Sequence, residues 1–562
     1  MIRLILPLTI FSTITLGLKA QSSTISSPVA PTLKAQTPTP QKQPTRNDTL
    51  KGSNTPDKNW WDIIHYDLTI KPDYTTKTIS GKNIIHYKIL KTGNRRLQID
   101  LQAPLQIDSV LYHQKQLNFS QVGDAWFITL PAQKTSRTRS IAIYYSGKPK
   151  QSVNPPWDGG IIWTTDSLAR PWMAVASQLS GASVWYPCKA NMDDKPELGV
   201  SITITTPDTL MAVANGHLVK QTKGPAATAS YTWEVKDPIN NYGLTFYIGK
   251  YVHVADKYPG EKGPLEMDFW VLDYNKEKVP GYLIPEVHKT FPSFEHWFGP
   301  YPFYEDGFKM VEAPYIGMEH QSAVGYGNHF ERGRYKGKHL TYWDYKTDRM
   351  VVHENAHEWF GNNITANDPA DRWIQEAFAG YAEELVMEDW YGHEAAEEFF
   401  LARSTGRISN EKPVISRHGI FEDAGDDMYM KGWVLVHMIR AMIGNDEKFR
   451  QLLREMNRQF YHQTVSSGQI EDFISLRAGI NLSKVFDQYL RTIQIPVLEY
   501  KTTKEHFSYR FSNCIPGFSM TIPLNGSQHL HITPNSDWQE IPLPPDTIKI
   551  DRDYYLESKK VE

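Results

Sequence analysis

Two histidines one helical turn apart constrain this chain more than any other feature. His353 and His357 flank Glu354 in the pattern His-Glu-x-x-His. Side chains four residues apart lie on the same face of a helix, so both imidazoles can bind one metal ion, for which zinc is the expected choice. Glu354 follows the first histidine directly and lies to the side of that ion, where its carboxylate can take a proton from water. The pattern predicts a metal-binding helix with Glu354 as a general base.

A second helix is predicted to supply the third ligand. Residues 348–360 are predicted as a helix that stops at Gly361, and residues 371–390 as the next one. Glu376 lies on this second helix, with eighteen residues between it and His357. Antiparallel packing of the two helices brings its carboxylate to both imidazoles and leaves one metal position open for water. The alternative, a chance pattern of surface histidines, does not explain this context.

The residues around Glu376 resemble a known family. The histidine pattern, the eighteen-residue spacing and the sequence Trp-Ile-Gln-Glu-Ala-Phe-Ala over residues 373–379 are similar to those of the gluzincin aminopeptidases, the family of aminopeptidase N and leukotriene hydrolase. This resemblance implies one Zn²⁺ per chain, held by His353, His357 and Glu376. It also implies a thermolysin-like catalytic domain and a substrate class, peptides with a free N-terminus.

A short segment before the metal-binding helix resembles the family's substrate-binding strand. Ile316-Gly317-Met318-Glu319-His320 is similar to the family pattern Gly-x-Met-Glu-Asn, with Ile316 and His320 as departures. The resemblance implies that Gly317 and Met318 line the substrate site and that the carboxylate of Glu319 receives the free α-amine. A fixed anion one residue's length from the metal selects peptides that begin there. The departures leave open how strictly the protein acts at the N-terminus.

Pro314 lies in the run that contains this segment, residues 308–320. Proline cannot donate a backbone hydrogen bond, so within a sheet it is typical of an edge strand. We therefore expect the run to form an edge strand, whose backbone can pair with an extended peptide.

Two further residues take candidate roles from the resemblance. Gln178 lies near the position where the family has Gln-x-Glu or Gln-x-Gln to hold the amine, although residues 177–182 lack the full motif. Tyr429 begins the sequence Tyr-Met-Lys-Gly, which resembles the family's Tyr-x-Lys-Gly. The resemblance implies that Tyr429 donates a hydrogen bond to the oxyanion of the tetrahedral intermediate, a task that suits a phenol, which is neutral at pH 7.

The first 57 residues precede every predicted core. Arg3, an apolar run over residues 4–18 and the small Ala20 predict a signal peptide, residues 1–20. The apolar run is short for a transmembrane helix, so no stable membrane span is expected, with an uncleaved anchor as the alternative. Residues 21–57 are rich in Ser, Thr, Pro, Gln and Lys and predict a disordered low-complexity linker. We therefore expect an exported protein, in the periplasm, on a surface or secreted.

Charge and cysteine content exclude several classes of protein. A formal net charge of −3 at pH 7 gives no indication of a nucleic-acid partner or an anionic membrane partner. The two cysteines, Cys188 and Cys514, are too few for a disulfide framework, and both are expected to be free.

The rest of the chain is too long for one core, and its pattern changes twice. Alternating apolar residues predict an N-terminal β domain over residues 58–254, helical periodicity predicts a catalytic domain over residues 255–495, and short alternating runs predict a small C-terminal β domain over residues 496–562. The resemblance implies that the first domain is saddle-shaped, with Trp185-Tyr186-Pro187-Cys188 similar to the family's Phe-Pro-Cys. The predicted fold class is multidomain α+β, without the large C-terminal helical domain of longer relatives.

The predicted function is zinc-dependent removal of N-terminal residues from peptides. An open metal position beside a general base argues for an active enzyme, because a structural zinc site is closed by a fourth protein ligand. Three alternatives stay open: a thermolysin-like endopeptidase, a hydrolase of non-peptide substrates, and a catalytically silent, zinc-stabilised peptide-binding protein. Cleavage of peptides with a blocked N-terminus would indicate the endopeptidase, and bound zinc without turnover would indicate the silent binding protein.

Overall fold

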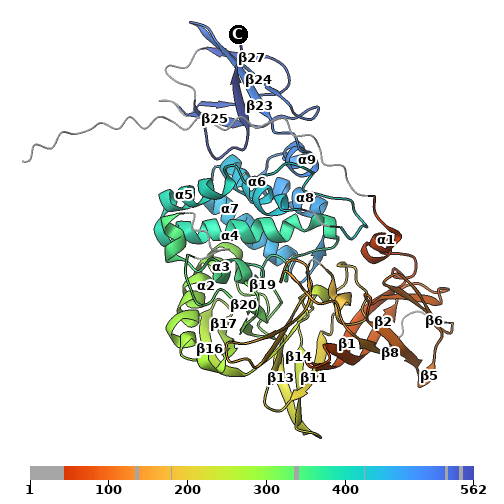
Figure 1. Cartoon of the computed structure of the whole chain (residues 1–562). Helices are drawn as coiled ribbons and strands as arrows, with labels where there is room; N and C mark the ends of the chain where they lie inside the picture. Colours follow the sequence, from red (N-terminus) through yellow and green to blue (C-terminus); the bar gives the residue numbers. More distant parts are fainter. Residues whose placement is uncertain are drawn as a thin grey trace, which may run out of the picture. The chain divides into compact units, whose positions relative to one another are not determined.

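The fold class is α+β with several domains, as predicted, and Figure 1 shows it in a computed structural model of the chain. The structure describes residues 43–132, 138–178, 180–333, 341–422, 425–525, 530–542 and 549–562. The predicted signal peptide and residues 21–42 of the predicted linker lie outside the described residues. Within the described ranges, no helix is both long enough and apolar enough to cross a membrane.

Alternation of buried and outward-facing side chains builds the large sheet of the N-terminal β domain. β1 (Trp61–Asp73) and β2 (Thr78–Ile89) pair antiparallel, with side chains such as Leu68 and Ile85 buried. The strand order is β13-β14-β11-β1-β2-β8-β4-β5, in which β1 and β11 are parallel. The other strands of this sheet are β4 (Gln106–Tyr112), β5 (Lys115–Gln116), β8 (Thr138–Gly147), β11 (Val200–Pro207), β13 (His217–Gly224) and β14 (Thr228–Val235).

Two smaller sheets complete the core of this domain, with the orders β12-β15-β10-β9 and β3-β7-β6. Trp185 and Cys188 are fully buried in the core that these sheets share with the large sheet. Cys188 and Cys514 are both free, as expected. The strands are β3 (Arg96–Asp100), β6 (Phe119–Val122), β7 (Ala125–Thr129), β9 (Gly160–Thr165), β10 (Pro171–Ala176), β12 (Met211–Ala214) and β15 (Phe246–Gly249).

A five-stranded sheet opens the catalytic domain, with the order β16-β17-β18-β20-β19. β18 is parallel to both of its neighbours and lies inside the sheet, whereas the short β19 is the edge strand. The prediction of one edge strand over residues 308–320 is therefore wrong for its first half. Pro314 lies between β18 and β19, where the sheet does not need its missing N–H. The strands are β16 (Tyr251–Gly260), β17 (Gly263–Leu272), β18 (Phe308–Glu312), β19 (Gly317–Met318) and β20 (Val324–Tyr326).

The helices of the catalytic domain pack around α4 (Trp373–Tyr391), which contacts α2, α3, α5 and α6 (Figure 1). Aromatic side chains fill this core, and Phe360 stacks on Phe378 with ring centroids 4.8 Å apart. α2 continues through Pro292 without dividing there. The other helices are α2 (Ile284–Phe298), α3 (Arg349–Ala356), α5 (His393–Ser404), α6 (Asp427–Ile443), α7 (Asp446–Gln459), α8 (Ser467–Ala478) and α9 (Ser483–Arg491).

Small sheets follow α9, with the orders β27-β24-β23-β29 and β26-β25-β28. Phe507, Tyr509 and Phe511 of β24 are buried, and Ser508 and Arg510 between them are more exposed. The strands are β23 (Val497–Thr502), β24 (His506–Ser512), β25 (Ile522–Asn525), β26 (Leu530–Ile532), β27 (Gln539–Pro542), β28 (Lys549–Ile550) and β29 (Glu557–Lys560). A separate parallel pair joins two loops of the helical part, β21 (Thr365–Ala366) and β22 (Thr464–Val465).

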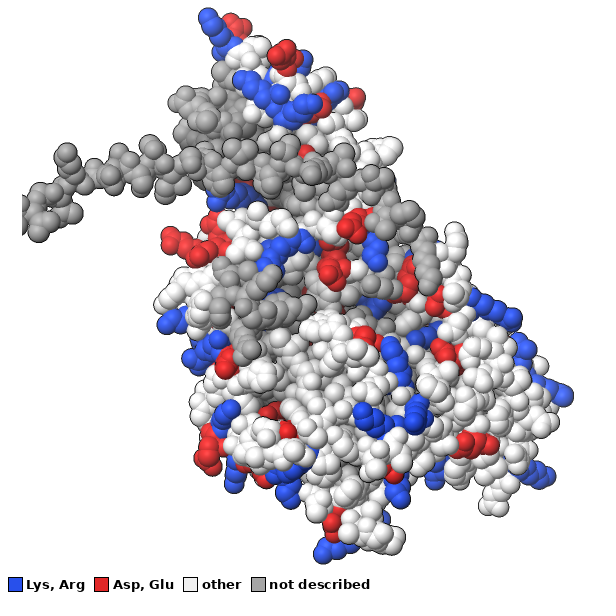
Figure 2. Space-filling view, viewed as in Figure 1, with Lys and Arg blue, Asp and Glu red and all other residues white. Residues whose placement is uncertain are grey.

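The surface carries both signs of charge. Basic and acidic side chains are interspersed over the face of the molecule shown in Figure 2. This distribution agrees with the small formal net charge of −3.

The last part of the predicted linker is ordered, which corrects the expectation of disorder for these residues. α1 (Arg46–Gly52) begins at Thr45, whose hydroxyl accepts from the backbone N–H of Asp48 at 3.2 Å. The carboxylate of Asp48 accepts in return from the N–H of Thr45 at 2.8 Å, which completes a capping box. Composition predicted disorder here because a helix of about two turns, built mainly from polar residues, has little apolar surface of its own.

A half-buried histidine connects the catalytic helices to the C-terminal β domain. His437 on α6 donates from Nδ1 to Oε1 of Glu384 at 2.6 Å, and its Nε2 lies 3.3 Å from Oδ1 of Asp553. Its ring stacks on Phe400 with centroids 3.9 Å apart. Burial lowers the pKa of His437, but the carboxylates of Glu384 and Asp553 outweigh burial and raise this pKa to about 10.

Substitution His437→Gln is expected to lower the free energy of unfolding by about 3 kcal/mol at pH 7, because it leaves buried carboxylate without its cation. A raised pKa stabilises the fold fully below the unfolded pKa of about 6.5 and loses this effect as pH rises through about 10. The difference in Tm between wild type and variant, measured by scanning calorimetry, should therefore be larger at pH 7 than at pH 10.5. The exposed pair of His506 offers the control His506→Gln, which should change Tm little. An equal Tm difference at both pH values would contradict a charged His437.

Candidate metal and catalytic site

A buried N-cap fixes the start of the metal-binding helix. The carboxylate of Asp348 accepts from the backbone N–H groups of Met350 at 3.1 Å and Val351 at 3.4 Å, which satisfies the first turn of α3. Tyr326 donates to the same carboxylate at 2.6 Å and ties the helix to β20. α3 is shorter than predicted and ends at Ala356, with a tightened turn after it.

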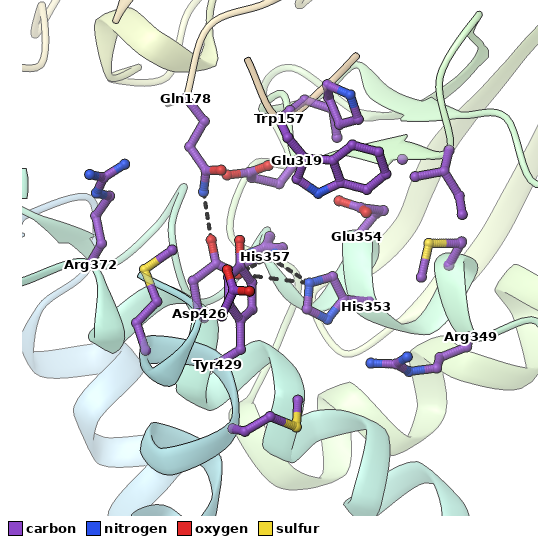
Figure 3. A pocket seen from close by; sticks show the side chains of 18 of the residues that line it. Trp157, Gln178, Glu319, Arg349, His353, Glu354, His357, Arg372, Asp426 and Tyr429 are labelled. Carbon is purple, nitrogen blue, oxygen red and sulfur yellow. Dashed lines mark hydrogen bonds and ion pairs between the residues drawn. The ribbon is translucent and has the colours of Figure 1, made fainter. Parts of the chain in front are cut away.

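The three predicted ligands lie together and face one point (Figure 3). The Nε2 atoms of His353 and His357 are 3.3 Å apart. Oε2 of Glu376, from α4, lies 3.5 Å from Nε2 of His357 and 3.8 Å from Nε2 of His353. Tetrahedral zinc with bonds of about 2.0–2.2 Å places its ligand atoms about 3.3–3.6 Å apart. Two imidazole nitrogens and one carboxylate oxygen at these separations fit zinc.

Hydrogen bonds from the far side of each ring orient the imidazoles. Nδ1 of His353 donates to Oε1 of Glu383 at 2.9 Å, and Nδ1 of His357 donates to the carbonyl of Phe360 at 2.9 Å. With Nδ1–H used in this way, each ring offers Nε2 to a metal ion that takes the place of its proton. Burial raises the pKa of Glu383, but the charge of Arg349 and the hydrogen bond with His353 outweigh it and lower this pKa to about 2. Glu383 is thus an ionised acceptor.

Buried carboxylates surround the ligands. Burial and the neighbouring Glu376 raise the pKa of Glu319 to about 7, and burial raises the pKa of Glu354 well above its usual range. Burial lowers the pKa of His357, but Glu376, Glu319 and Glu354 outweigh it and raise this pKa to about 10. So much buried negative charge favours a cation at the centre.

Gly317 gives Glu354 the room that it needs. A Cβ atom at position 317 would lie 2.3 Å from Oε1 of Glu354, closer than any real contact. The carboxylate of Glu354 therefore packs directly on the backbone of β19. Met318 is buried beside it and lines the same cavity.

Glu319 offers a buried acceptor. Its side chain is 3% exposed, and its Oε1 has no hydrogen-bond partner among the described residues. Its backbone carbonyl accepts from the side-chain amide of Asn362 at 2.8 Å, which fixes its position. Gln178 donates to Oε1 of Glu376 at 2.6 Å and also hydrogen-bonds Glu319, so it lies between the metal ligand and this acceptor (Figure 3).

His320, a departure from the family pattern, points away from the acceptor. It is fully buried, its Nδ1 lies 2.9 Å from the hydroxyl of Tyr247, and burial lowers its pKa to about 3. The imidazole of His320, which stands where the family pattern has the amide of Asn, is therefore neutral and belongs to the core beneath β19.

A cavity of about 1210 Å³ is lined by the three ligands and by Gln178, Gly317, Met318, Glu319 and Glu354. Tyr429, from α6, lines it on the side of the imidazoles, and Trp157, from the N-terminal β domain, lines it on the side of Glu319 and Glu354 (Figure 3). All nine predicted site residues therefore line this one cavity. Their roles in binding and catalysis stay predictions. Residues that the sequence analysis missed also contribute, namely Trp157, Arg349, Arg372, Glu383 and Asp426. Glu383 lies two helical turns after Glu376, and this spacing could have identified it from the sequence. Trp157 lies on a loop without a motif, so nothing in the sequence indicated its place.

Three ligands of this kind, a buried carboxylate beside them and an enclosing cavity are typical of a mononuclear hydrolytic metal site. Comparison with known proteins agrees. Residues 286–489 match the Peptidase family M1 domain. Aminopeptidase B of Rattus norvegicus is 21% identical over 460 residues, which cover 74% of this chain and 65% of that protein. Probable aminopeptidase 1 of Sulfurisphaera tokodaii is 24% identical, over 84% of this chain and 59% of that protein.

Solved structures share the fold. A mutant M1 zinc metallopeptidase from Deinococcus radiodurans, bound to a Tyr-Ser-Ala substrate, superposes with a TM-score of 0.65 at 20% identity, covering 78% of this chain and 96% of that one. Residues 286–489 are therefore similar to the M1 peptidases, and the chain shares the fold of the solved M1 zinc metallopeptidase. This chain spans less than two thirds of the length of the curated relatives named above.

Substitution Glu383→Gln is expected to weaken zinc binding by about 10–100-fold, because a neutral amide orients His353 less firmly and makes its imidazole less basic. The dissociation constant is measured by competition with a chromophoric chelator. Glu394→Gln, at an exposed position of α5, is the matched control and should leave it unchanged. Equal zinc affinity in wild type and Glu383→Gln would show that this carboxylate does not support the site.

Proposed function

We propose that the protein is a zinc-dependent aminopeptidase that removes residues one at a time from the free N-terminus of peptides. The observation that carries this proposal is the free oxygen of Glu319, buried at one end of the cavity beside Gln178 and the metal ligands. A buried carboxylate oxygen is costly unless it is paired, and a protonated α-amine is a partner that only an unblocked peptide offers. The names of the relatives support the same activity.

His353, His357 and Glu376 would hold the zinc ion. When bound, zinc supplies Lewis-acid polarisation of the scissile carbonyl and lowers the pKa of water in the site. Glu354 takes the proton of the attacking water and returns it to the leaving nitrogen. Its raised pKa suits this task, because the protonated form is then readily reached. Tyr429 donates a hydrogen bond to the oxygen that becomes negative.

We further propose that the protein acts on peptides after export. Arg3, the apolar run that follows it and Ala20 support this localisation, in the periplasm, on a surface or outside the cell. These residues lie outside the described part of the chain. Peptide substrates are the partners that the cavity accommodates.

Zinc-loaded protein is incubated with matched peptides that carry a free or an acetylated N-terminus, and mass spectrometry identifies the products. We expect stepwise loss of single residues from the free peptides alone. Glu319→Ala should lower kcat/KM for free peptides by about 100-fold, because it removes a charge-assisted hydrogen bond to the amine. Glu305→Ala, at an exposed acidic position, is the control.

Each of the other outcomes identifies a different activity. Internal cleavage of both free and acetylated peptides would contradict the role of Glu319 and indicate an endopeptidase. Zinc binding without any cleavage would indicate a non-peptide hydrolase or a silent binding protein.

A further inference from the structure

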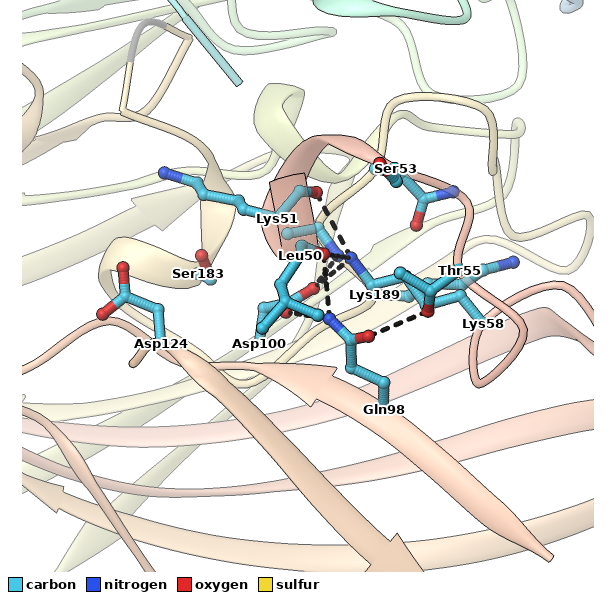
Figure 4. Close-up of polar contacts among 12 residues, drawn as sticks. Leu50, Lys51, Ser53, Thr55, Lys58, Gln98, Asp100, Asp124, Ser183 and Lys189 are labelled. Atoms are coloured by element: carbon cyan, nitrogen blue, oxygen red, sulfur yellow. Dashed lines mark hydrogen bonds and ion pairs between the residues drawn. The ribbon is translucent and has the colours of Figure 1, made fainter. Parts of the chain in front are cut away.

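Helix α1 is held by the N-terminal β domain on one side. A seven-residue helix is too short to be stable alone, so its neighbours keep it in place. The ammonium of Lys58 donates to the carbonyls of Leu50 at 2.9 Å and Lys51 at 3.2 Å. Lys58 also forms a buried ion pair with Asp100 at 2.7 Å, and Gln98 donates to the carbonyl of Leu50 at 2.9 Å (Figure 4). The last turn of α1 is thus capped by side chains of the sheet.

On its other side α1 binds the loop that precedes α6. The backbone N–H of Phe421 donates to the carbonyl of Asp48 at 3.1 Å, and the hydroxyl of Ser53 donates to the carbonyl of Gly419 at 2.7 Å. A Cβ atom on Gly52 would lie 2.4 Å from the backbone nitrogen of Phe421, so only glycine permits this approach. α1 therefore joins the N-terminal β domain to a catalytic-domain loop.

Lys51 lies between the segment that follows Gln178 and the loop that carries Phe421. Its buried ammonium donates to the carbonyl of Ser180, which also accepts from Gln102 at 2.7 Å. Ser180 lies two residues after Gln178, the side chain that donates to Glu376. The same ammonium lies 3.7 Å from the ring centroid of Phe421, which lines the cavity.

We propose that α1 is a strap across the rim of the catalytic cavity and that Lys51 is a positioning residue, which holds the Gln178 turn and Phe421 in their places. This inference rests on the proposed function. Lys51 does not reach the metal ligands, so its loss should loosen the wall that holds the substrate more than the chemical step. The segment that composition assigns to a linker would then be part of the substrate site.

Lys51→Met tests this role, since methionine keeps an apolar stem and removes the charge and the donor. We expect KM for an unblocked peptide to rise about fivefold or more while kcat changes less than about twofold, as for a lost binding interaction. Lys51→Arg retains a cation and a hydrogen-bond donor, so its KM should lie close to that of the wild type. Lys71→Met, at an exposed lysine of β1, is the matched control and should behave as wild type. Zinc content should be equal in all four proteins.

Hydrogen exchange gives a readout that does not depend on activity. The N–H of Phe421 should exchange at least about tenfold faster in Lys51→Met than in Lys71→Met, because its acceptor belongs to the loosened helix. Hydrogen exchange at Phe421 tests the role of α1 even if the wild-type protein cleaves no peptide. A lack of cleavage would overturn the proposed function alone. If Lys51→Met does not fold, Gly52→Ala is used in its place, since its added methyl forces α1 away from Phe421.

Two results would overturn the strap. Unchanged KM and unchanged exchange at Phe421 in both Lys51→Met and Gly52→Ala would show that α1 does not position the wall. An equal rise of KM in Lys51→Met and Lys51→Arg, with a lower Tm in both variants, would show that Lys51 contributes to the stability of the fold instead.

Discussion

Buried negative charge at one point is the constraint on which the rest of the structure depends. Glu319, Glu354 and Glu376 lie within one cavity around His357, out of contact with most of the solvent. Carboxylates in such a place are unfavourable unless a cation or a proton neutralises them. The structure meets this need with a ligand position that fits a divalent ion, and it keeps Glu354 beside that position as a carrier of protons. Under the proposed function, the same charge would favour a substrate that brings a positive amine.

The surrounding fold keeps these groups in place. Asp348 fixes the start of α3, Glu383 on α4 fixes the ring of His353, and Gly317 on β19 lets Glu354 lie against the sheet. The N-terminal β domain contributes Gln178 and Trp157 to the cavity, so both domains line it.

Local geometry explains which features the sequence predicted. The positions of His353 and His357 follow from helical periodicity alone, and the placement of Glu376 needs one further helix at a known spacing. Gln178 and Tyr429 required the resemblance to a family, because nothing local separates them from other glutamines and tyrosines. Tertiary contacts decided the rest. The order of α1 comes from Lys58 and its partners, which lie beyond the helix, and composition therefore assigned this segment to a linker.

The most direct test is a crystal structure of the zinc-loaded protein, with anomalous diffraction recorded at the zinc edge. We predict one strong anomalous peak within bonding distance, about 2.0–2.2 Å, of His353, His357 and Glu376, with the remaining position open to water or substrate. A peak at another place, or a fourth protein ligand that closes the site, would contradict a catalytic metal held by these three residues.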